Sequence, residues 1–408
     1  MFSLLLAIIY LAFISLGLPD SLLGSAWPVM REAMGVSSSF AGIVTMLIAS
    51  GTIISSLSSD WLTKKIGTGL VVAISVTLTA LGLLGFSFST QFWMLCCWAL
   101  PYGLGAGAID AALNNYVALH YSARHMSWLH CCWGVGASIS PYIMGLALEN
   151  QWGWENGFRI VFYIQIVLAG LMFLSLPLWK KCQVQTKLKE VAEEKPQAEK
   201  ELKEKTGIFQ VLKIRGVLFL LTAFFCYCAL ESTSGLWAAS YLVSIRQVDK
   251  TSAARFASFF YLGITIGRAI AGFFANKIKD KNMIRIGFGI LTCGILLVLI
   301  PFSSSIPALV GLIVIGLGCA PIYPSIIHST PFNFGPDKSQ AIIGIEMASA
   351  YVGSTFMPPL FGLIGQVTSF AWYPLYLLSF NLAMFILLEV LNRIIAGREK
   401  NVIQDNRA

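Results

Sequence analysis

Leu18-Pro-Asp-Ser-Leu-Leu-Gly24 places a proline and a carboxyl group inside a long apolar segment. An acid, a hydroxyl residue and a glycine occur at the same spacing in Ala229-Leu-Glu-Ser-Thr-Ser-Gly235. A duplicated unit of helices produces repeats in the same order when both copies have the same orientation. The sequence therefore predicts two related halves. Three further pairs repeat in order: Gly51…Asp60 with Gly267…Asn276, Gly103-Leu-Gly105 with Gly316-Leu-Gly318, and Gly136…Pro141…Gly145 with Gly353…Pro358…Gly362.

The composition is that of a membrane protein. Of 408 residues, 56% are hydrophobic and 12% are charged, with a mean hydropathy of +0.73, whereas soluble domains carry about 25% charged residues. A membrane-spanning helix needs about 20 mostly apolar residues. The predicted fold class is therefore an all-α membrane protein with twelve spans. We place them at 2–30, 36–58, 69–89, 92–119, 127–148, 158–179, 216–244, 252–275, 283–302, 306–328, 340–366 and 371–396.

Residues 180–207 separate the two halves. This segment is rich in Lys and Glu and almost free of large apolar side chains, a composition that favours a solvated connector. We therefore expect an N-terminal six-helix bundle at 1–180, a cytoplasmic linker at 181–207 and a C-terminal six-helix bundle at 208–408.

The basic residues are distributed unevenly between the loops. Nearly all of the 28 Lys and Arg residues fall in alternate loops, in the linker and in the C-terminal tail. Because cytoplasmic loops carry an excess of Lys and Arg, we expect both termini in the cytoplasm of a multi-pass protein of the cell membrane. The first apolar stretch has no basic leader or cleavage site, so we expect it to remain as the first helix.

Enzymes and nucleic-acid-binding proteins fit the sequence poorly. It contains no G-x-x-x-x-G-K-[S/T] segment for nucleotide phosphates, and its four His residues show no metal-ligand spacing. The net charge of +8 lies mostly in alternate loops. We expect no enzyme activity, no metal and no cofactor. We expect a monomer in the lipid bilayer whose activity uses a proton gradient, with sodium as the alternative ion.

The repeated segments resemble the major facilitator superfamily over essentially the full length of the chain. Ser56-Leu-Ser-Ser-Asp-Trp-Leu-Thr-Lys-Lys-Ile-Gly67 is similar to the loop signature between helices 2 and 3 of that superfamily. The resemblance implies twelve transmembrane helices in two pseudo-symmetric six-helix bundles, which open to each side of the membrane in turn. It implies a gating or structural role for Asp60 in this loop.

Two segments narrow the resemblance to the fucose and glucose proton symporter family. They are Pro19-Asp-Ser-Leu-Leu23 in the first helix and Gly103-Leu-Gly105…Ile109-Asp-Ala-Ala-Leu-Asn-Asn115 in the fourth. In that family, an acid in each of these helices is implicated in proton coupling and sugar binding. The resemblance carries these roles over to Asp20 and Asp110.

The cost of charges in the bilayer points to the same acids. Ionisable groups within apolar helices are functional candidates, because a bilayer disfavours charge. We expect Asp20, Asp110 and Glu231 to face a central cavity, where a carboxyl group can bind and release a proton. For Asp20, a carboxylate fixed to a neighbouring helix is the structural alternative.

Polar and aromatic residues on the same helices predict a sugar-binding site. Asp110 and Asn114 are four residues apart, so they share a helix face and can bond sugar hydroxyls, with bonding between helices as the alternative. Other residues offer stacking surfaces or further hydrogen bonds, with packing as the alternative for each. They are Asn115, His130, Trp133, Trp27, Trp237 and Tyr323.

Arg268 and Glu346 are predicted to pair with each other near the cytoplasmic ends of helices 8 and 11, in a gating or structural role. The function that we expect is proton-coupled symport of a neutral sugar or polyol. Proton-driven export of a drug or small metabolite is the alternative, because Gly136…Pro141…Gly145 is similar to an antiporter signature in which Ser140 replaces the usual glycine.

Overall fold

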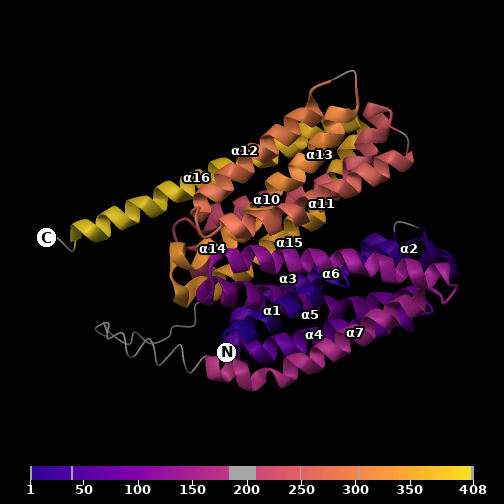
Figure 1. The fold of residues 1–408 in the computed structure, drawn as a ribbon, viewed down its shortest axis with the longest axis horizontal. Coiled ribbons are helices and arrows are strands. Elements are labelled where there is room, and N and C mark those ends of the chain that lie inside the picture. The colour runs from indigo at the N-terminus through magenta and orange to yellow at the C-terminus, as the bar shows by residue number, and fades with distance from the viewer. Residues whose placement is uncertain (1, 38–39, 183–207, 249, 302–303, 406–408) are drawn as a thin grey trace. The chain divides into compact units, whose positions relative to one another are not determined.

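Helices make up all the regular secondary structure in the described part of the chain. The computed structural model describes all residues except 1, 38–39, 183–207, 249, 302–303 and 406–408. Figure 1 labels the helices, and no strand occurs in the described part of the chain. The helices are α1 (Phe2–Gly17), α2 (Leu22–Ala33), α3 (Phe40–Ile66), α4 (Thr68–Ser87), α5 (Phe92–His120), α6 (Ala123–Glu149), α7 (Trp154–Leu174), α9 (Ile208–Leu212), α10 (Val217–Arg246), α11 (Lys250–Phe274), α12 (Asp280–Leu299), α13 (Ile306–Cys319), α14 (Ile322–Phe334), α15 (Pro336–Val367), η1 (Phe370–Trp372) and α16 (Tyr373–Asp405).

Contacts between the helices divide the chain into two compact units. The first unit contains Met1–Tyr116 and Cys132–Val211, and the second contains Val117–Cys131 and Leu212–Ala408. The first part of α6 therefore groups with the second unit. The domain boundaries at 180 and 208 stay predictions, and linker residues 183–207 lie outside the described residues.

The helices have the length and composition of membrane spans. In the described part of the chain, eleven are long and apolar enough to cross a membrane. Three of these spans each combine two helical elements: Ser3–Trp27 combines α1 with α2, Ile306–Phe334 combines α13 with α14, and Phe370–Arg398 combines η1 with α16. A further apolar stretch, Phe259–Phe274 in α11, is shorter. The predicted all-α membrane class is confirmed.

The predicted loop after the second span is mostly helical. α3 continues to Ile66, and the chain turns at Gly67, whose φ of 82° suits a residue without a side chain. Lys64 Nζ lies 2.8 Å from Asp60 Oδ2, one turn apart on this helix. The helix therefore continues beyond residue 58, where the second apolar stretch was predicted to end.

The core of the first unit lies between α2, α4, α5 and α7. The rings of Phe86 and Phe158 pack edge-on with centroids 5.7 Å apart, and Tyr102 lies 6.0 Å from Phe86. Trp27 belongs to the same cluster and is 7% exposed. This burial fits the packing alternative for Trp27.

Two glycines allow α1 to cross α6 at close range. A Cβ atom on Gly17 would overlap the carbonyl oxygen of Trp133, and one on Gly136 would overlap the carbonyl oxygen of Ile14. Small residues permit such close backbone contact between helices in lipid. The crossing places Trp133 beside Gly17 at the end of α1. The indole of Trp133 thereby reaches Asp20.

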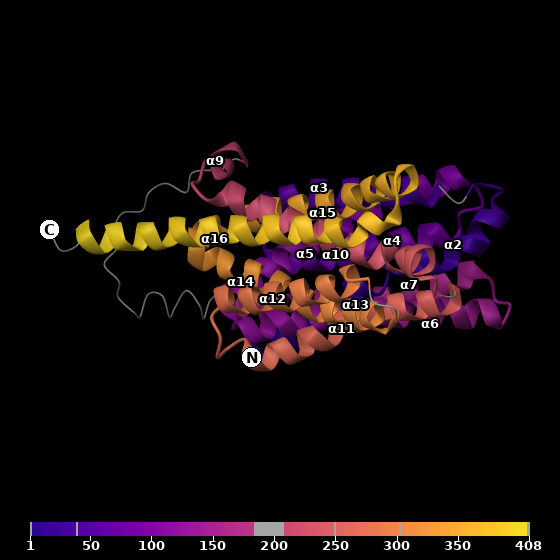
Figure 2. The same ribbon diagram turned by 90° about the horizontal axis from the view of Figure 1, so that it is seen from above.

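Aromatic side chains fill the second unit between α10, α13, α15 and α16. Tyr227 and Tyr373 are fully buried, and their hydroxyls donate to the carbonyl oxygens of Cys319 and Ser234, each at 3.0 Å. These bonds satisfy the polar tips of the two rings, as burial requires. Figure 2 shows α16 as one long helix that runs along this unit.

The crossing of α1 and α6 makes a stability prediction. Gly136→Ala is expected to lower the stability of the purified protein by about 1–3 kcal/mol, because the added methyl group overpacks the crossing. Gly145→Ala on the same helix is the control, since no atom lies within 4 Å of its added Cβ. Thermal unfolding in detergent measures both variants. Equal stability of the two variants would contradict a close contact at Gly136.

Candidate functional site

Asp20 lies where the first membrane span breaks. α1 ends at Gly17 and α2 begins at Leu22, so the carboxyl group sits in the turn between them. Pro19 has no backbone N–H, which favours this interruption. The side chain of Asp20 is exposed, and the break therefore presents a carboxyl group that solvent can reach.

Two neutral donors hold the Asp20 carboxylate. Trp133 Nε1 on α6 donates to Oδ2 at 2.8 Å, and the Tyr102 hydroxyl on α5 donates to Oδ1 at 3.3 Å. Ser21 next to it donates to the carbonyl oxygen of Ala137 on α6 at 2.8 Å. The break is thus fastened to α6 at two points. In the described part of the chain no cation pairs with Asp20.

Tyr102 was missed by the sequence analysis. It is 4% exposed and directly precedes the glycine pair Gly103 and Gly105, on which the repeat comparison depended. A tyrosine beside Pro101 in an apolar span is a weak signal for a polar contact. Only the fold brings its hydroxyl to Asp20.

Asp110 and Asn114 form a buried pair on α5. They are 5% and 0% exposed, and Asn114 Nδ2 donates to Asp110 Oδ1 at 2.8 Å. The predicted shared helix face is therefore confirmed. Asn115 is also buried, at 7% exposure. The first unit therefore contains the carboxyl groups of Asp20 and Asp110 and the amide of Asn114.

Arg268 in the second unit pairs with Glu231. Arg268 Nη2 on α11 lies 3.3 Å from Glu231 Oε1 on α10, and the two side chains are 4% and 19% exposed. The predicted pair of Arg268 with Glu346 is therefore wrong. Glu346 instead lies 3.2 Å from the Thr330 hydroxyl. The prediction used depth along each helix, which does not determine which helices are neighbours.

Tyr323 brings together several aromatic groups beside this ion pair. Its ring lies 4.6 Å from that of His130, 4.7 Å from that of Phe224 and 5.9 Å from the guanidinium carbon of Arg268. His130 is 5% exposed. Two predicted binding residues, His130 and Tyr323, therefore contact each other within the second unit.

Trp237 and Asp60 are engaged elsewhere. Trp237 Nε1 donates to the carbonyl oxygen of Pro358 at 2.7 Å, and its ring packs against Phe370. These contacts fit the packing alternative for Trp237. Asp60 pairs with Lys64 on the same helix, and its predicted gating role stays a prediction.

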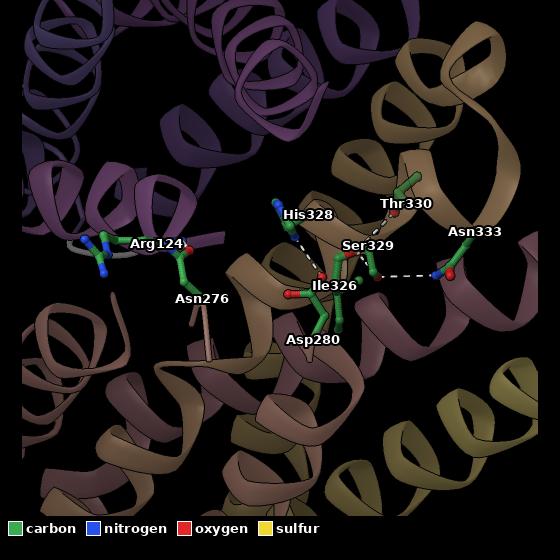
Figure 3. A network of polar contacts seen from close by, with 8 residues as sticks. All are labelled: Arg124, Asn276, Asp280, Ile326, His328, Ser329, Thr330 and Asn333. Atoms are coloured by element: carbon green, nitrogen blue, oxygen red, sulfur yellow. Dashed lines mark hydrogen bonds and ion pairs between the residues drawn. The ribbon is translucent and has the colours of Figure 1, made fainter. Parts of the chain in front are cut away.

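A cavity of about 570 Å³ in the second unit lies outside the predicted site. It is lined by Tyr121–Ala123, Ala275–Asp280, His328 and Phe332. Figure 3 shows two contacts beside it: the backbone N–H of Arg124 donates to Asn276 Oδ1 at 3.3 Å, and His328 Nδ1 lies 2.7 Å from Asp280 Oδ2. The described residues contain no group of three metal-ligating side chains.

Long apolar helices with buried carboxyl groups among them are typical of an integral membrane protein. Such carboxyl groups mark pathways for ions or polar substrates. Residues 9–326 and 232–402 match the Major Facilitator Superfamily. The chain therefore belongs to this superfamily. It is a multi-pass membrane transporter and not an enzyme.

Three relatives cover most of the chain. Bypass of stop codon protein 6 of Saccharomyces cerevisiae is 25% identical over 89% of this chain and 77% of its own length. The glucose/mannose transporter GlcP of Bacillus subtilis is 23% identical over 77% of each chain. The cis,cis-muconate transport protein of Acinetobacter baylyi is 24% identical over 88% of this chain and 86% of its own.

A solved structure has the same fold. FucP, the E. coli fucose:proton symporter, in its outward conformation superposes with a TM-score of 0.76 at 16% identity. The match covers 95% of this chain and 98% of FucP. At this identity the likeness extends to the fold alone.

The pair of Arg268 and Glu231 makes a second stability prediction. Glu231→Leu is expected to destabilise the protein by about 3 kcal/mol, because it leaves the buried guanidinium without its carboxylate. Glu231→Leu with Arg268→Leu removes both charges and is expected to recover most of this loss. Thermal unfolding in detergent measures the cycle.

Glu389→Leu is the control for this cycle, because Glu389 pairs with Arg285 at a more exposed position. We expect it to change stability little. A double variant that is no more stable than Glu231→Leu would show that the unpaired guanidinium of Arg268 does not cause the destabilisation.

Proposed function

We propose that this protein is a secondary active transporter that moves a neutral sugar or polyol together with a proton. The observation that carries the proposal is the Asp20 carboxylate, which is exposed at a helix break and held by the neutral donors Trp133 and Tyr102. A carboxylate without a cation partner can take up a proton without breaking an ion pair. Its two donors fix its position in either protonation state.

The neighbouring residues supply groups that suit a polyhydroxylated substrate. Asp110 and Asn114 together offer carboxylate and amide atoms that can both accept and donate hydrogen bonds. The Trp133 ring, fixed by its bond to Asp20, offers an apolar face for a sugar ring. The similarity to the glucose/mannose transporter GlcP supports a sugar as the substrate.

The remaining groups have supporting roles in this proposal. Glu231 contributes to proton coupling in the second unit, and His130 and Tyr323 contribute to substrate binding. Asn115 completes the polar face of α5, and Trp27 and Trp237 support the site by packing. Asp60 and Arg268 belong to the gating machinery.

Transport follows from alternating access between two six-helix bundles. This proposal takes the shorter apolar stretch Phe259–Phe274 as the twelfth span. The protein acts as a monomer in the cell membrane, with both termini in the cytoplasm, and uses the proton gradient without a cofactor. Sodium is the alternative ion, because backbone carbonyls at the break near Pro19 can coordinate it beside Asp20.

Proton movement with sugar tests the proposal directly. Proteoliposomes are prepared with the purified protein and an internal pH indicator, at the same pH inside and outside. Their interior should acidify when a transported sugar is added outside. Asp20→Asn keeps the size of the side chain but cannot take up a proton. We expect it to abolish the acidification while downhill exchange of the sugar continues.

Asp337→Asn is a matched control, because it makes the same substitution at an acid at the start of α15, in the second unit. It should acidify like the wild type. Normal acidification by Asp20→Asn would sink the proton assignment, and alkalinisation by the wild type would favour the exporter. Uptake driven by a sodium gradient at constant pH would assign sodium as the coupling ion.

A further inference from the structure

Glu346 on α15 is enclosed by protein. Its exposure is 0%, and every residue of the surrounding run Ala341–Ala348 is buried. An ionised carboxylate in such a place is costly unless a cation or several hydrogen bonds compensate it. The surroundings of Glu346 therefore decide which form of the side chain the structure accommodates.

Among the described residues, the carboxyl group of Glu346 has a single hydrogen-bond partner. Its Oε2 lies 3.2 Å from Oγ1 of Thr330 on α14. Its Oε1 is buried and has no hydrogen-bond partner in the described part of the chain. An ionised carboxylate offers about four acceptor sites, so one hydroxyl group leaves most of them unused.

The Thr330 hydroxyl also contacts a carbonyl group. Its Oγ1 lies 3.1 Å from the carbonyl oxygen of Ile326, one turn earlier on α14 (Figure 3). A hydroxyl carries one hydrogen, and the carbonyl oxygen can only accept it. When Thr330 donates to Ile326, its contact with Glu346 becomes a hydrogen bond only if the carboxyl group donates. That donation requires a proton on Oε2.

No other described charge compensates Glu346. Among the described elements, those with the most extensive contacts to α15 are α10, α14, η1 and α16. Glu231 on α10 pairs with Arg268, His328 on α14 pairs with Asp280, and Glu389 on α16 pairs with Arg285. In the described part of the chain, none of the titratable groups on these elements, or on α15 itself, forms an ion pair with Glu346. They include Tyr227, Glu231, His328, Glu389, Asp337 and Lys338.

We infer that Glu346 is a proton-binding site of the second unit, separate from Asp20, and that it holds a proton in this conformation as a donor to Thr330. Loss of the proton leaves a bare carboxylate between α14 and α15. Release therefore requires that these helices separate or that water reaches the carboxyl group. Pro331, directly after Thr330, removes one backbone hydrogen bond from α14 and lowers the cost of deforming it there.

Infrared difference spectroscopy of the purified full-length protein tests the inference without knowledge of the substrate. The spectrum of the wild type minus that of Glu346→Gln should contain a carboxylic-acid carbonyl band at neutral pH. Glutamine keeps the shape of the protonated acid and can donate a hydrogen bond to Thr330 in its place, so this variant should remain folded. Thr330→Val should keep the band but shift it, because the acid loses its acceptor.

Two comparisons separate this site from other carboxyl groups. Glu389→Gln should lose a carboxylate band instead, because Glu389 pairs with Arg285. Asp20→Asn should retain the Glu346 band, so the result is independent of the proposed sugar transport. A wild-type spectrum that differs from that of Glu346→Gln only in carboxylate bands would overturn the inference, as would a band that Thr330→Val leaves unshifted.

Discussion

The low polarity of the bilayer is the constraint on which this structure depends. Charged and polar groups in membrane spans must find partners inside the protein or face a wet cavity. The chain meets this demand in different ways at its acids. Asp20 accepts hydrogen bonds from neutral donors at an exposed helix break. Asp110 accepts one from the amide of Asn114, and Glu231 forms an ion pair with Arg268.

These arrangements give the two halves of an ancient repeat different chemistry. Asp20 and Glu231 occupy matching positions in the repeat, yet only Glu231 has an arginine partner. The position that matches Asp110 is Tyr323, which lies among aromatic rings and a histidine. The halves thus share the frame of the repeat, while Asp20, the carboxyl group that carries the proposed coupling without a cation partner in the described part of the chain, lies in the first.

The sequence predicts local features of this structure well and lateral contacts poorly. Apolar length identifies the spans, and the spacing of Asp110 and Asn114 places them on one face, because both depend on one helix only. The pairing of Arg268 depends on which helices are neighbours, and depth along a helix does not contain that information. Tyr102 was missed for the same reason, since its partner Asp20 lies on another helix. Aromatic residues such as Trp27 and Trp237 serve packing and binding equally well in a sequence.

The central claim is that Asp20 binds the proton that accompanies the substrate. Calorimetry of sugar binding to the purified protein, repeated in buffers of different ionisation enthalpy, measures the protons taken up on binding. The measurement is made at a pH at which Asp20 is ionised in the absence of sugar. The account then predicts proton uptake by the wild type on sugar binding and none by Asp20→Asn. Equal proton uptake by the two proteins would contradict it.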